Sequence, residues 1–309
     1  MSPAALIGVD WGSSNARAFL FGRDGSRLAE RAAAIGIARH QGEACAGVLA
    51  DWLRDWLDDY PGVPLLLCGM VGSRNGWREC AYLPTPAAPA LLAGSLHAFD
   101  WRGRGVAIVP GVCHDNPLDG FSDVMRGEET QIAGLPAVCP QFDQLDWLLM
   151  PGTHCKWIRL RQGGIVELAT YMTGEMYALL RQHSLLSGLI DDGGAWRVEP
   201  FLQGVEAAVA HPDWLHQLFG VRARGVRDAM PPDALAGWLS GLLIGYEIQA
   251  ALARPADAPA KLCGIVGAPR LARCYAAALR HFSIETVAID GDQAVAAGLW
   301  SLARQAGWV

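Results

Sequence analysis

A short stretch near the N-terminus carries the first residues whose types and spacing suit chemistry. It reads I-G-V-D-W-G-S-S-N-A-R over residues 7–17, an apolar run of strand length followed by a turn of small residues. Gly12, Ser13 and Ser14 leave backbone N–H groups free to face an anion, as in a phosphate-binding loop. Asp10 ends the predicted strand, where a carboxylate can hold Mg²⁺ directly or through water during phosphoryl transfer.

Arg17 adds a planar positive group to the same turn. The alternative interpretation is an ordinary β-turn, in which Asp10 bonds nearby backbone and the glycine only supplies a positive φ. The stretch alone does not decide between these interpretations, so independent evidence is needed from elsewhere in the chain.

A second copy of the layout supplies that evidence. Residues 147–160 read W-L-L-M-P-G-T-H-C-K-W-I-R-L: a strand, a Gly152-Thr153 turn and an alternating strand. Each copy then continues through another glycine turn into a further strand, which predicts two related β-hairpins and an internal duplication. Thr153, His154 and Lys156 of the second copy are candidates to meet phosphate groups. Lys156 is one of only two lysines in the chain, although a surface strand lysine is the alternative.

An acidic segment between the two hairpins offers a general base. It reads G-F-S-D-V-M-R-G-E-E-T-Q from Gly120 and contains Asp123, Glu128 and Glu129. We expect Ser122 to cap a helix over residues 123–134. Glutamates in a first helical turn are also favoured by the helix dipole alone, so each by itself is unremarkable.

The last candidate element is a strand, a small-residue turn and a helix over residues 262–275, read as L-C-G-I-V-G-A-P-R-L-A-R-C-Y. The helix is expected to begin near Pro269. Gly264, Gly267 and Ala268 would let backbone approach a flat ligand closely.

Composition narrows the class of protein. With 309 residues and 51% hydrophobic content, the chain can bury ample core, and we expect two domains, residues 1–138 and 139–309. A net charge of −6 without a basic run makes nucleic acid an unexpected partner.

No apolar run approaches the ~20 residues that a spanning helix needs, and the first strand begins too early for a signal peptide, so we expect no membrane partner and a cytoplasmic protein. Eight scattered cysteines without zinc spacing predict reduced thiols.

These motifs together resemble one family. D-W-G-S-S-N-A-R at Asp10, G-F-S-D-V-M-R-G-E-E-T-Q at Gly120 and M-P-G-T-H-C-K-W at Met150 are similar to the 2-dehydro-3-deoxygalactonokinase family over essentially the whole chain. The resemblance implies a two-domain α/β fold of the actin/Hsp70/sugar-kinase (ribonuclease H-like) superfamily, with duplicated mixed β-sheets flanked by helices and a central cleft. It also implies phosphorylation of the 6-hydroxyl of 2-dehydro-3-deoxy-D-galactonate, with ATP and Mg²⁺ as cofactors.

The resemblance also implies roles for residues. The N-terminal domain would hold the sugar acid and the C-terminal domain ATP, with Gly264, Gly267 and Ala268 in the adenosine loop. The related exopolyphosphatases use a glutamate of the acidic segment, whereas sugar kinases more often use an aspartate at a strand-to-helix junction. Asp123 and Glu129 therefore both stay candidates for the base, with Asp123 narrowly preferred.

Arginine is expected to bind the carboxylate of the substrate, because its planar fork pairs bidentately with that group. The three candidates are Arg74, Arg126 and Arg17. Arg74 is preferred because glycines flank its loop, and Trp77 beside it could cover the sugar chain.

Other functions stay open at this point. An exopolyphosphatase-like phosphohydrolase, or a kinase of another sugar or sugar acid, would use the same fold. The acidic balance argues against a polyanion substrate. A non-enzymatic regulator of the related type would carry an N-terminal helix-turn-helix, for which the first strand begins too early. The sequence leaves the oligomeric state open and is compatible with a homodimer.

Overall fold

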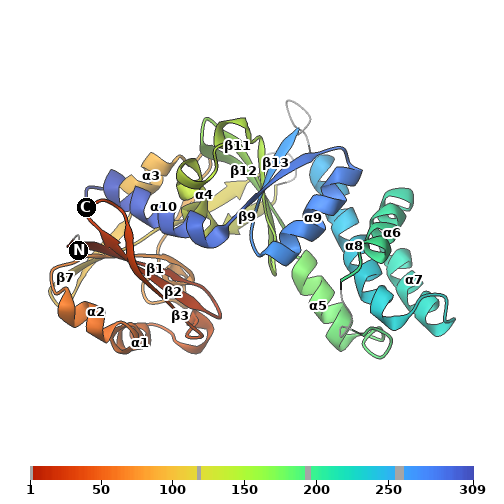
Figure 1. Cartoon of the computed structure of the whole chain (residues 1–309), viewed down its shortest axis with the longest axis horizontal. Coiled ribbons are helices and arrows are strands. Elements are labelled where there is room, and N and C mark those ends of the chain that lie inside the picture. The colour runs from red at the N-terminus through yellow and green to blue at the C-terminus, as the bar shows by residue number, and fades with distance from the viewer. Residues whose placement is uncertain (1–2, 117–119, 192–195, 255–260) are drawn as a thin grey trace. The chain divides into compact units, whose positions relative to one another are not determined.

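The chain folds into two compact units. The computed structural model describes residues 3–116, 120–191, 196–254 and 261–309 (Figure 1). Unit 1 comprises residues 1–143, 160–168 and 290–309, and unit 2 comprises residues 144–159 and 169–289. This division differs from the expected boundary at residue 138, because the last twenty residues belong to unit 1, where helix α10 (Gly291–Gln305) packs against helix α4 (Glu128–Val138) and strand β1 (Ala4–Trp11).

Unit 1 is built on a six-stranded mixed sheet with the strand order β3-β2-β1-β4-β7-β6. β1 pairs antiparallel with β2 and parallel with β4, so the first hairpin lies beside a parallel core. The apolar run predicted as the first strand forms β1, and a second apolar run forms the fully buried β4. The remaining bounds in this sheet are β2 (Ala16–Gly22), β3 (Arg27–Ala33), β4 (Leu65–Gly69), β6 (His97–Trp101) and β7 (Arg104–Ile108).

A second, three-stranded sheet in unit 1 has the order β5-β8-β9 and corrects one prediction. Ser122 does not cap a helix, because Ser122–Met125 is strand β9, paired antiparallel with β8 (Gly111–Asp115). The helix begins only at Glu128, after Gly127 turns the chain with a φ of 111°. Local polar residues resembled a cap, but pairing with β8 holds the segment extended. Strand β5 is Tyr82–Pro84.

A five-stranded sheet repeats the arrangement of the first four strands of the chain. It has the order β12-β11-β10-β13-β14, in which β10 pairs antiparallel with β11 and parallel with β13. The order β3-β2-β1-β4 thus recurs as β12-β11-β10-β13, which confirms the predicted duplication. The bounds are β10 (Trp147–Met150), β11 (Cys155–Arg161), β12 (Gly164–Tyr171), β13 (Leu262–Val266) and β14 (Glu285–Ile289).

The helices of unit 1 pack by close backbone approach. A Cβ atom built on Gly298 of α10 would overlap the carbonyl oxygen of Thr130, and one on Gly134 of α4 would overlap that of Ala294. These glycines therefore let α4 and α10 pack closely, one against the other. The other helices are α1 (Ala44–Trp52), α2 (Arg54–Asp59) and α3 (Pro89–Gly94), with 3₁₀ turns at Ile37–Arg39, Met70–Gly72 and Phe142–Gln144.

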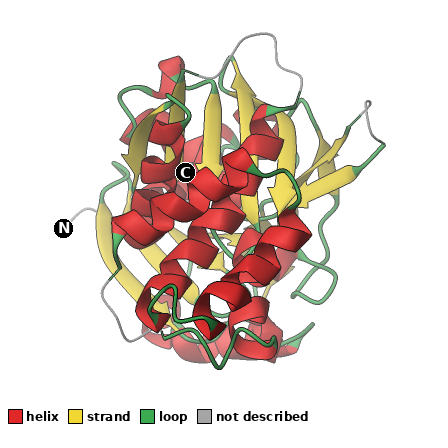
Figure 2. Cartoon of the chain, turned by 90° about the vertical axis from the view of Figure 1, so that its right-hand side faces the viewer, coloured by secondary structure: helices red, strands yellow, loops and turns green. Residues whose placement is uncertain are grey.

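Unit 2 carries a larger helical layer, which is coloured red in Figure 2. Its helices are α5 (Thr173–His183), α6 (Val198–Ala210), α7 (Trp214–Val226), α8 (Pro232–Leu252) and α9 (Pro269–His281). α8 has the length and mean hydropathy of a membrane span, but 61% of its most apolar stretch is buried inside the fold, as expected of a core helix.

Gly237, Gly241 and Gly245 repeat every four residues on α8, and two of these glycines let α8 pack closely against α6. A Cβ atom on Gly241 would overlap the carbonyl oxygen of Phe201 on α6, and one on Gly245 would lie 2.7 Å from the Ala208 side chain. Gly237 is different, because its nearest neighbour, Pro200, would be at an ordinary 3.5 Å.

We therefore expect Gly241→Ala to lower the free energy of unfolding by about 1–3 kcal/mol, because backbone must move to admit the methyl group. Urea unfolding followed by tryptophan fluorescence measures the change. Gly237→Ala, four residues earlier on the same helix, is the matched control and should be neutral or stabilising by up to about 1 kcal/mol. A Gly241→Ala protein as stable as the wild type would contradict this account of the packing.

Candidate active site

The first hairpin turn presents small polar groups at the end of β1. The Gly12 N–H donates to the Asn15 carbonyl at 2.9 Å, which closes the turn. The carbonyls of Ser13 and Ser14 accept N–H groups from the chain near residues 36–38. Within the described residues, the N–H groups of Ser13 and Ser14 donate no backbone hydrogen bond, and both side chains are exposed. The turn therefore keeps donors available for an anion, as predicted.

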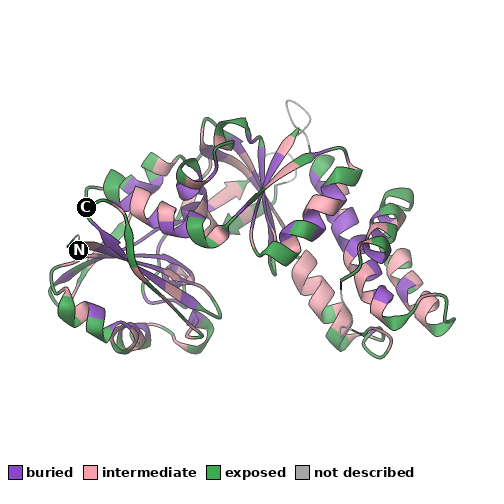
Figure 3. Cartoon of the chain, in the orientation of Figure 1, coloured by how far each residue is buried: buried purple, intermediate pink, exposed green. Residues whose placement is uncertain are grey.

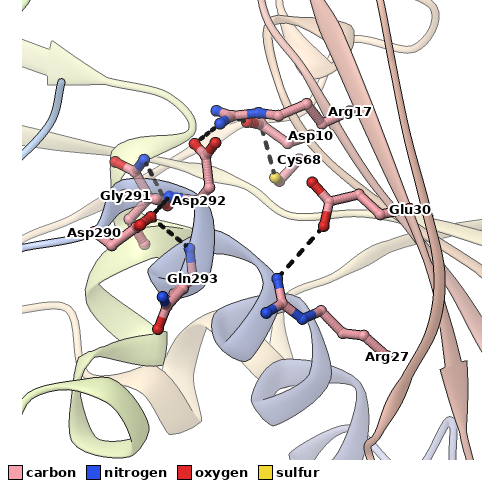
Figure 4. Close-up of polar contacts among 10 residues, drawn as sticks. Asp10, Arg17, Arg27, Glu30, Cys68, Asp290, Gly291, Asp292 and Gln293 are labelled. Carbon is pink, nitrogen blue, oxygen red and sulfur yellow. Dashed lines mark hydrogen bonds and ion pairs between the residues drawn. The ribbon is translucent and has the colours of Figure 1, made fainter.

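Asp10 and Arg17 stand directly opposite one another in the β1–β2 pairing. Arg17 Nη2 lies 3.0 Å from Asp10 Oδ2, and its Nη1 pairs with Asp292 at the start of α10 (Figure 4). Burial raises the pKa of the Asp10 carboxyl above its ordinary value, although Arg17 acts to lower it. Carboxylate oxygens are the ligands that Mg²⁺ prefers, and burial disfavours an uncompensated charge on Asp10, so this side chain suits a metal-binding role.

Asp292 was not identified from the sequence. Asp290 caps α10, and its Oδ1 accepts the N–H groups of Asp292 at 2.8 Å and Gln293 at 3.0 Å (Figure 4). This cap fixes the first turn of α10 and with it the position of Asp292 beside Arg17. The D-G-D triplet at residues 290–292 is a visible helix-start signal, but nothing in it indicates a contact with the first hairpin.

Two glycines bring the ends of other elements close to Asp10. Gly69 ends β4 with a φ of 87°, and a Cβ atom there would lie 2.8 Å from the Trp11 carbonyl oxygen and 3.3 Å from Asp10 Oδ1. A Cβ atom on Gly127 would lie 3.3 Å from the Gly69 Cα. The start of α4 is therefore held against the end of β4, next to Asp10.

Glu129 lies in the first turn of α4 and is completely buried. Its Oε2 accepts the Gly127 N–H at 2.7 Å, and its Oε1 accepts the Thr130 hydroxyl at 3.0 Å. Burial, and then the charge of Glu128, raise the pKa of Glu129 to about 8. Glu128 is only half-buried, and its Oε2 accepts the Arg126 N–H at 3.1 Å.

Cys68 on β4 pairs with Asp10 on β1. Burial, and then the charges of Asp10 and Glu129, raise the pKa of its thiol. The Cys68 Sγ lies 3.9 Å from Asp10 Oδ1 (Figure 4). Asp123, by contrast, is a half-buried residue on β9 opposite His114. Of the two candidates for the base, Glu129 is therefore the one on the element that lies next to Asp10, whereas Asp123 lies on β9.

The predicted carboxylate-binding residues lie in different surroundings. Arg74 has an 87% exposed side chain and only a 3.7 Å ion pair with Glu79. Arg126 is buried; it donates to the Cys80 carbonyl at 2.7 Å and its guanidinium lies 4.3 Å from the centre of the Tyr82 ring. Within the described residues its Nε and Nη1 have no hydrogen-bond partner.

Trp77 corrects a second prediction. Its side chain is buried in the core of unit 1, where its ring packs edge-on against Phe99 and Trp101. A ring enclosed by two other aromatic side chains has no face left to cover a sugar chain. The glycine-flanked loop suggested an accessible residue, but the apolar surface of the ring is buried instead.

The second hairpin turn is held by helix α5. The Glu175 N–H donates to the Thr153 carbonyl at 2.9 Å, and His154 Nε2 lies 2.6 Å from Glu175 Oε2. A Cβ atom on Gly174 would overlap the carbonyl oxygen of Gly152, so α5 begins directly against the turn. Lys156, opposite Met150 in the strand pairing, is buried, and no ion pair to it is found in the described part of unit 2.

Unit 2 also contains a cavity of about 270 Å³ beside this turn. Gly152 lies at its edge, and side chains and backbone of α5, α8 and α9 form its walls. They include Thr173, Tyr177, Gly237, Ser240, Arg270 and Tyr275. None of Tyr177, Gly237 and Ser240 was singled out as a binding residue from the sequence, because their spacing on helices is equally typical of core packing.

The glycines of the expected adenosine loop do not line this cavity. Gly264 lies inside β13, where a Cβ atom would lie 2.7 Å from Leu148, so its role is sheet packing. Gly267 and Ala268 connect β13 to α9, as predicted, with Ala268 at the N-cap position. It is the following helix, through Arg270 and Tyr275, that borders the cavity.

A buried carboxyl group connects the walls of the cavity to the second hairpin. Glu247 on α8 accepts the Trp157 Nε1–H at 2.8 Å and the Tyr275 hydroxyl at 2.7 Å. Burial raises the pKa of the Glu247 carboxyl, and raises that of the Cys155 thiol beside it. Strand β11 and helices α8 and α9 therefore meet at one polar group in an otherwise apolar core.

Comparison with known proteins identifies one family. The 2-keto-3-deoxy-galactonokinase family matches residues 10–302. A 2-dehydro-3-deoxygalactonokinase of Escherichia coli strain K12 is 36% identical over 302 residues, which cover 97% of this chain and 98% of that protein. A crystal structure from Sinorhizobium meliloti, assigned as a 2-dehydro-3-deoxygalactonokinase, is 34% identical with a TM-score of 0.82, and the match covers 97% of this chain and 96% of the other.

A distant structure agrees in fold alone. The activator of the 2-hydroxyisocaproyl-CoA dehydratase from Clostridium difficile, solved with ADPNP, is 9% identical with a TM-score of 0.50 over 98% of this chain and 96% of its own. Together with the duplicated strand order, this confirms the predicted α/β fold with duplicated mixed sheets flanked by helices.

The Glu247 contacts generate a stability prediction. Glu247→Leu should lower the free energy of unfolding by about 2–6 kcal/mol, because two buried donors, each worth roughly 1–3 kcal/mol, lose their acceptor. Glu247→Gln is the matched control and should cost much less, since an amide keeps the volume and an acceptor oxygen. Urea unfolding of the three proteins at neutral pH measures both values. Equal losses in the two variants would show that size, not hydrogen bonding, sets the cost.

Proposed function

Because this chain belongs to the 2-keto-3-deoxy-galactonokinase family, we propose that it transfers the γ-phosphoryl group of ATP to the 6-hydroxyl of 2-dehydro-3-deoxy-D-galactonate. The products are 2-dehydro-3-deoxy-6-phosphogalactonate and ADP. The observation that carries the proposal is that Gly69 and Gly127 hold the start of α4, which carries Glu129, against the end of β4 next to Asp10. Phosphoryl transfer needs charge neutralisation and a proton acceptor, and these two carboxyl groups suit the two tasks.

ATP binding is assigned mainly to unit 2. The cavity between α5, α8 and α9 is lined by apolar and polar groups in similar measure, and Gly237 leaves room at its wall for a nucleoside. The cavity reaches Gly152, so a nucleoside there would direct its phosphates to Thr153, His154 and Lys156. The buried Lys156 ammonium, without an ion pair among the described residues, suits a phosphate group.

Mg²⁺ is assigned to Asp10 in unit 1. Groups of three or more His, Cys, Asp or Glu side chains arranged for a metal are absent from the described residues, which fits a cation held by one carboxylate, water and substrate phosphates. When bound, Mg²⁺ would neutralise phosphate charge. Arg17 holds the Asp10 carboxylate in place, and the Gly12, Ser13 and Ser14 turn of unit 1 offers N–H groups to a phosphate.

Glu129 is the proposed general base, in preference to Asp123. Its carboxylate would take the proton of the sugar hydroxyl as the phosphoryl group is transferred. Each of its oxygens accepts one hydrogen bond in the structure and keeps another lone pair for that proton. A pKa of about 8 makes Glu129 a stronger proton acceptor than an ordinary glutamate.

The substrate carboxylate is assigned to arginine. Arg17 already neutralises two carboxylates, and Arg126 is buried against Cys80 and Tyr82. Arg74 keeps an exposed guanidinium, so it stays the preferred residue to pair with the sugar acid. We place the reaction in the cytoplasm, which suits eight cysteines that are all free.

A coupled ADP-release assay over a panel of 2-keto-3-deoxy sugar acids tests the proposal. The expected result is ADP release that depends on 2-dehydro-3-deoxy-D-galactonate, exceeds that with its C4 epimer, and yields the 6-phosphate. Release of phosphate from ATP or polyphosphate without any sugar acid would instead indicate a phosphohydrolase. Equal rates with unrelated sugars would reject the sugar-acid assignment.

We expect Glu129→Gln to lower kcat by about 10²–10⁴-fold while leaving the KM for ATP nearly unchanged, because only proton removal is lost. Asp123→Asn is the matched control and should retain most activity. For the wild type, kcat/KM for the sugar acid should rise with pH and level off above about 8, since the base acts when deprotonated. A large loss in Asp123→Asn with normal Glu129→Gln turnover would move the base to β9.

The same group predicts a pH effect on stability that is independent of activity. The folded state holds the Glu129 proton more tightly than the unfolded chain does, since its folded pKa is about 8. The free energy of unfolding should therefore fall as pH rises from about 5 to 8, and Glu129→Gln should reduce that fall.

Asp10→Asn should abolish turnover while the protein stays folded, because the amide cannot replace a carboxylate as a Mg²⁺ ligand. Turnover is measured in the coupled assay and folding by circular dichroism. Asp24→Asn is a control in the neighbouring β2–β3 turn, where the Asp24 side chain accepts hydrogen bonds from the Ser26 N–H and hydroxyl. Wild-type kcat in a folded Asp10→Asn protein would reject the metal assignment.

A further inference from the structure

Helix α7 carries an apolar face that no described part of the chain covers. Leu215, Phe219 and Val226 are 63%, 64% and 58% exposed. The opposite face of the helix packs inward, where Val221 is buried and the Arg224 guanidinium lies 4.2 Å from the centre of the Trp238 ring on α8. α7 thus lies on the outside of the helical layer of unit 2 (Figure 3). Exposed apolar patches of this kind commonly mark interaction surfaces.

Arg222 and Leu185 complete this surface. Arg222 is the one charged residue in the same row of the helix, and its Nη1 donates to the Leu185 carbonyl at 2.9 Å. This bond holds the loop residue Leu185, which is 74% exposed, beside the row. We name Leu185, Leu215, Phe219, Arg222 and Val226 the α7 surface.

The four α7 positions of this surface have the same spacing whether they are read from the N-terminal or the C-terminal end of the helix. Positions 215, 219, 222 and 226 follow one another at intervals of four, three and four residues. At about 100° per residue these four positions lie within roughly 60° of one another around the helix. Alternating intervals of three and four residues are those of a coiled-coil seam.

We propose that the α7 surface pairs antiparallel with the α7 surface of a second copy of this chain, across a twofold axis between Phe219 and Arg222. In that arrangement, Leu215 of each copy lies opposite Val226 of the other, and Phe219 lies opposite Arg222. An isologous interface needs such a self-complementary pattern, because each residue meets its partner twice.

The charges of the helix favour the same occupant. Arg222 would place its guanidinium on the face of the facing phenylalanine ring, a cation–π contact that accounts for an arginine in an apolar row. The next pair outward follows the same rule, with Trp214 opposite Arg227, and both are exposed here. Antiparallel helices also bring opposite ends of their dipoles together. A different apolar partner would gain nothing from this symmetry.

The surface is small, so association should be weak, with a dissociation constant in roughly the micromolar range. Sedimentation velocity of the full chain over about a hundredfold range of concentration should show a dimer fraction that increases with concentration. Wild-type protein that stays monomeric throughout would leave the face to a different partner and overturn the proposal.

Exchange of the central pair separates this interface from any other dimer contact. Phe219→Arg places two arginines opposite one another and should raise the dissociation constant at least about tenfold, since like charges meet. Adding Arg222→Phe to Phe219→Arg re-creates a phenylalanine–arginine pair and should restore dimer formation to near the wild-type level. Only antiparallel pairing across this axis predicts that rescue.

Leu91→Arg on α3 is the control, because Leu91 is an exposed leucine of unit 1, and it should leave the dissociation constant unchanged. Circular dichroism checks that each variant is folded, which is expected because all altered side chains are at least partly exposed. A dimer that persists in Phe219→Arg, or no rescue by the double variant, would overturn the proposal. The outcome does not depend on the proposed kinase chemistry.

Discussion

The ion pair between Asp10 and Arg17 depends on the register of the first hairpin. The two residues stand directly opposite each other, so their side chains emerge on the same face of the sheet. A slip of one residue would turn Arg17 to the other face and leave Asp10 without its cation. The short turn closed by Gly12 and Asn15 is therefore more than a connection, because it fixes that register. Burial then makes the pair necessary, since an uncompensated carboxylate at this position would be strongly destabilising.

Close packing of two helices determines which other acidic side chains lie near the Asp10–Arg17 ion pair. Gly134 and Gly298 let α4 and α10 approach each other at backbone distance, and each helix contributes an acidic residue near its N-terminus. On α4 this residue is Glu129, which is buried and has a raised pKa. On α10 it is Asp292, which forms an ion pair with Arg17. Two carboxyl groups in one small region thus have different environments, one apolar and one cationic, and so suit different tasks. Larger residues at the glycine positions would separate the helices and with them this arrangement.

Much of the fold was predictable because it depends on local patterns. The strand–turn–strand repeat at residues 7–33 and 147–171 is visible in hydrophobic runs and glycine turns, and the two sheets repeat it in strand order. The places of Asp10 near the end of β1 and of Lys156 near the start of β11 were predictable in the same way. Features of the site that depend on a partner distant in sequence were not predictable. Pairing with β8 holds Ser122–Met125 extended, and aromatic neighbours bury Trp77. Asp292 and the cavity beside α5 arise in the same way, from tertiary contacts that leave no local signal.

The path of the chain has a consequence for how the protein is made. Unit 1 begins at the N-terminus but is completed only by α10, the last helix of the sequence. On the ribosome, β1 and β4 therefore emerge long before the helix that covers them, and unit 2 is synthesised in between. A nascent chain shorter than about 290 residues lacks Asp292 and the glycine face on which α4 packs, so its first sheet would stay partly uncovered. No single cut in the sequence can separate the two units, because each consists of segments from different parts of the chain.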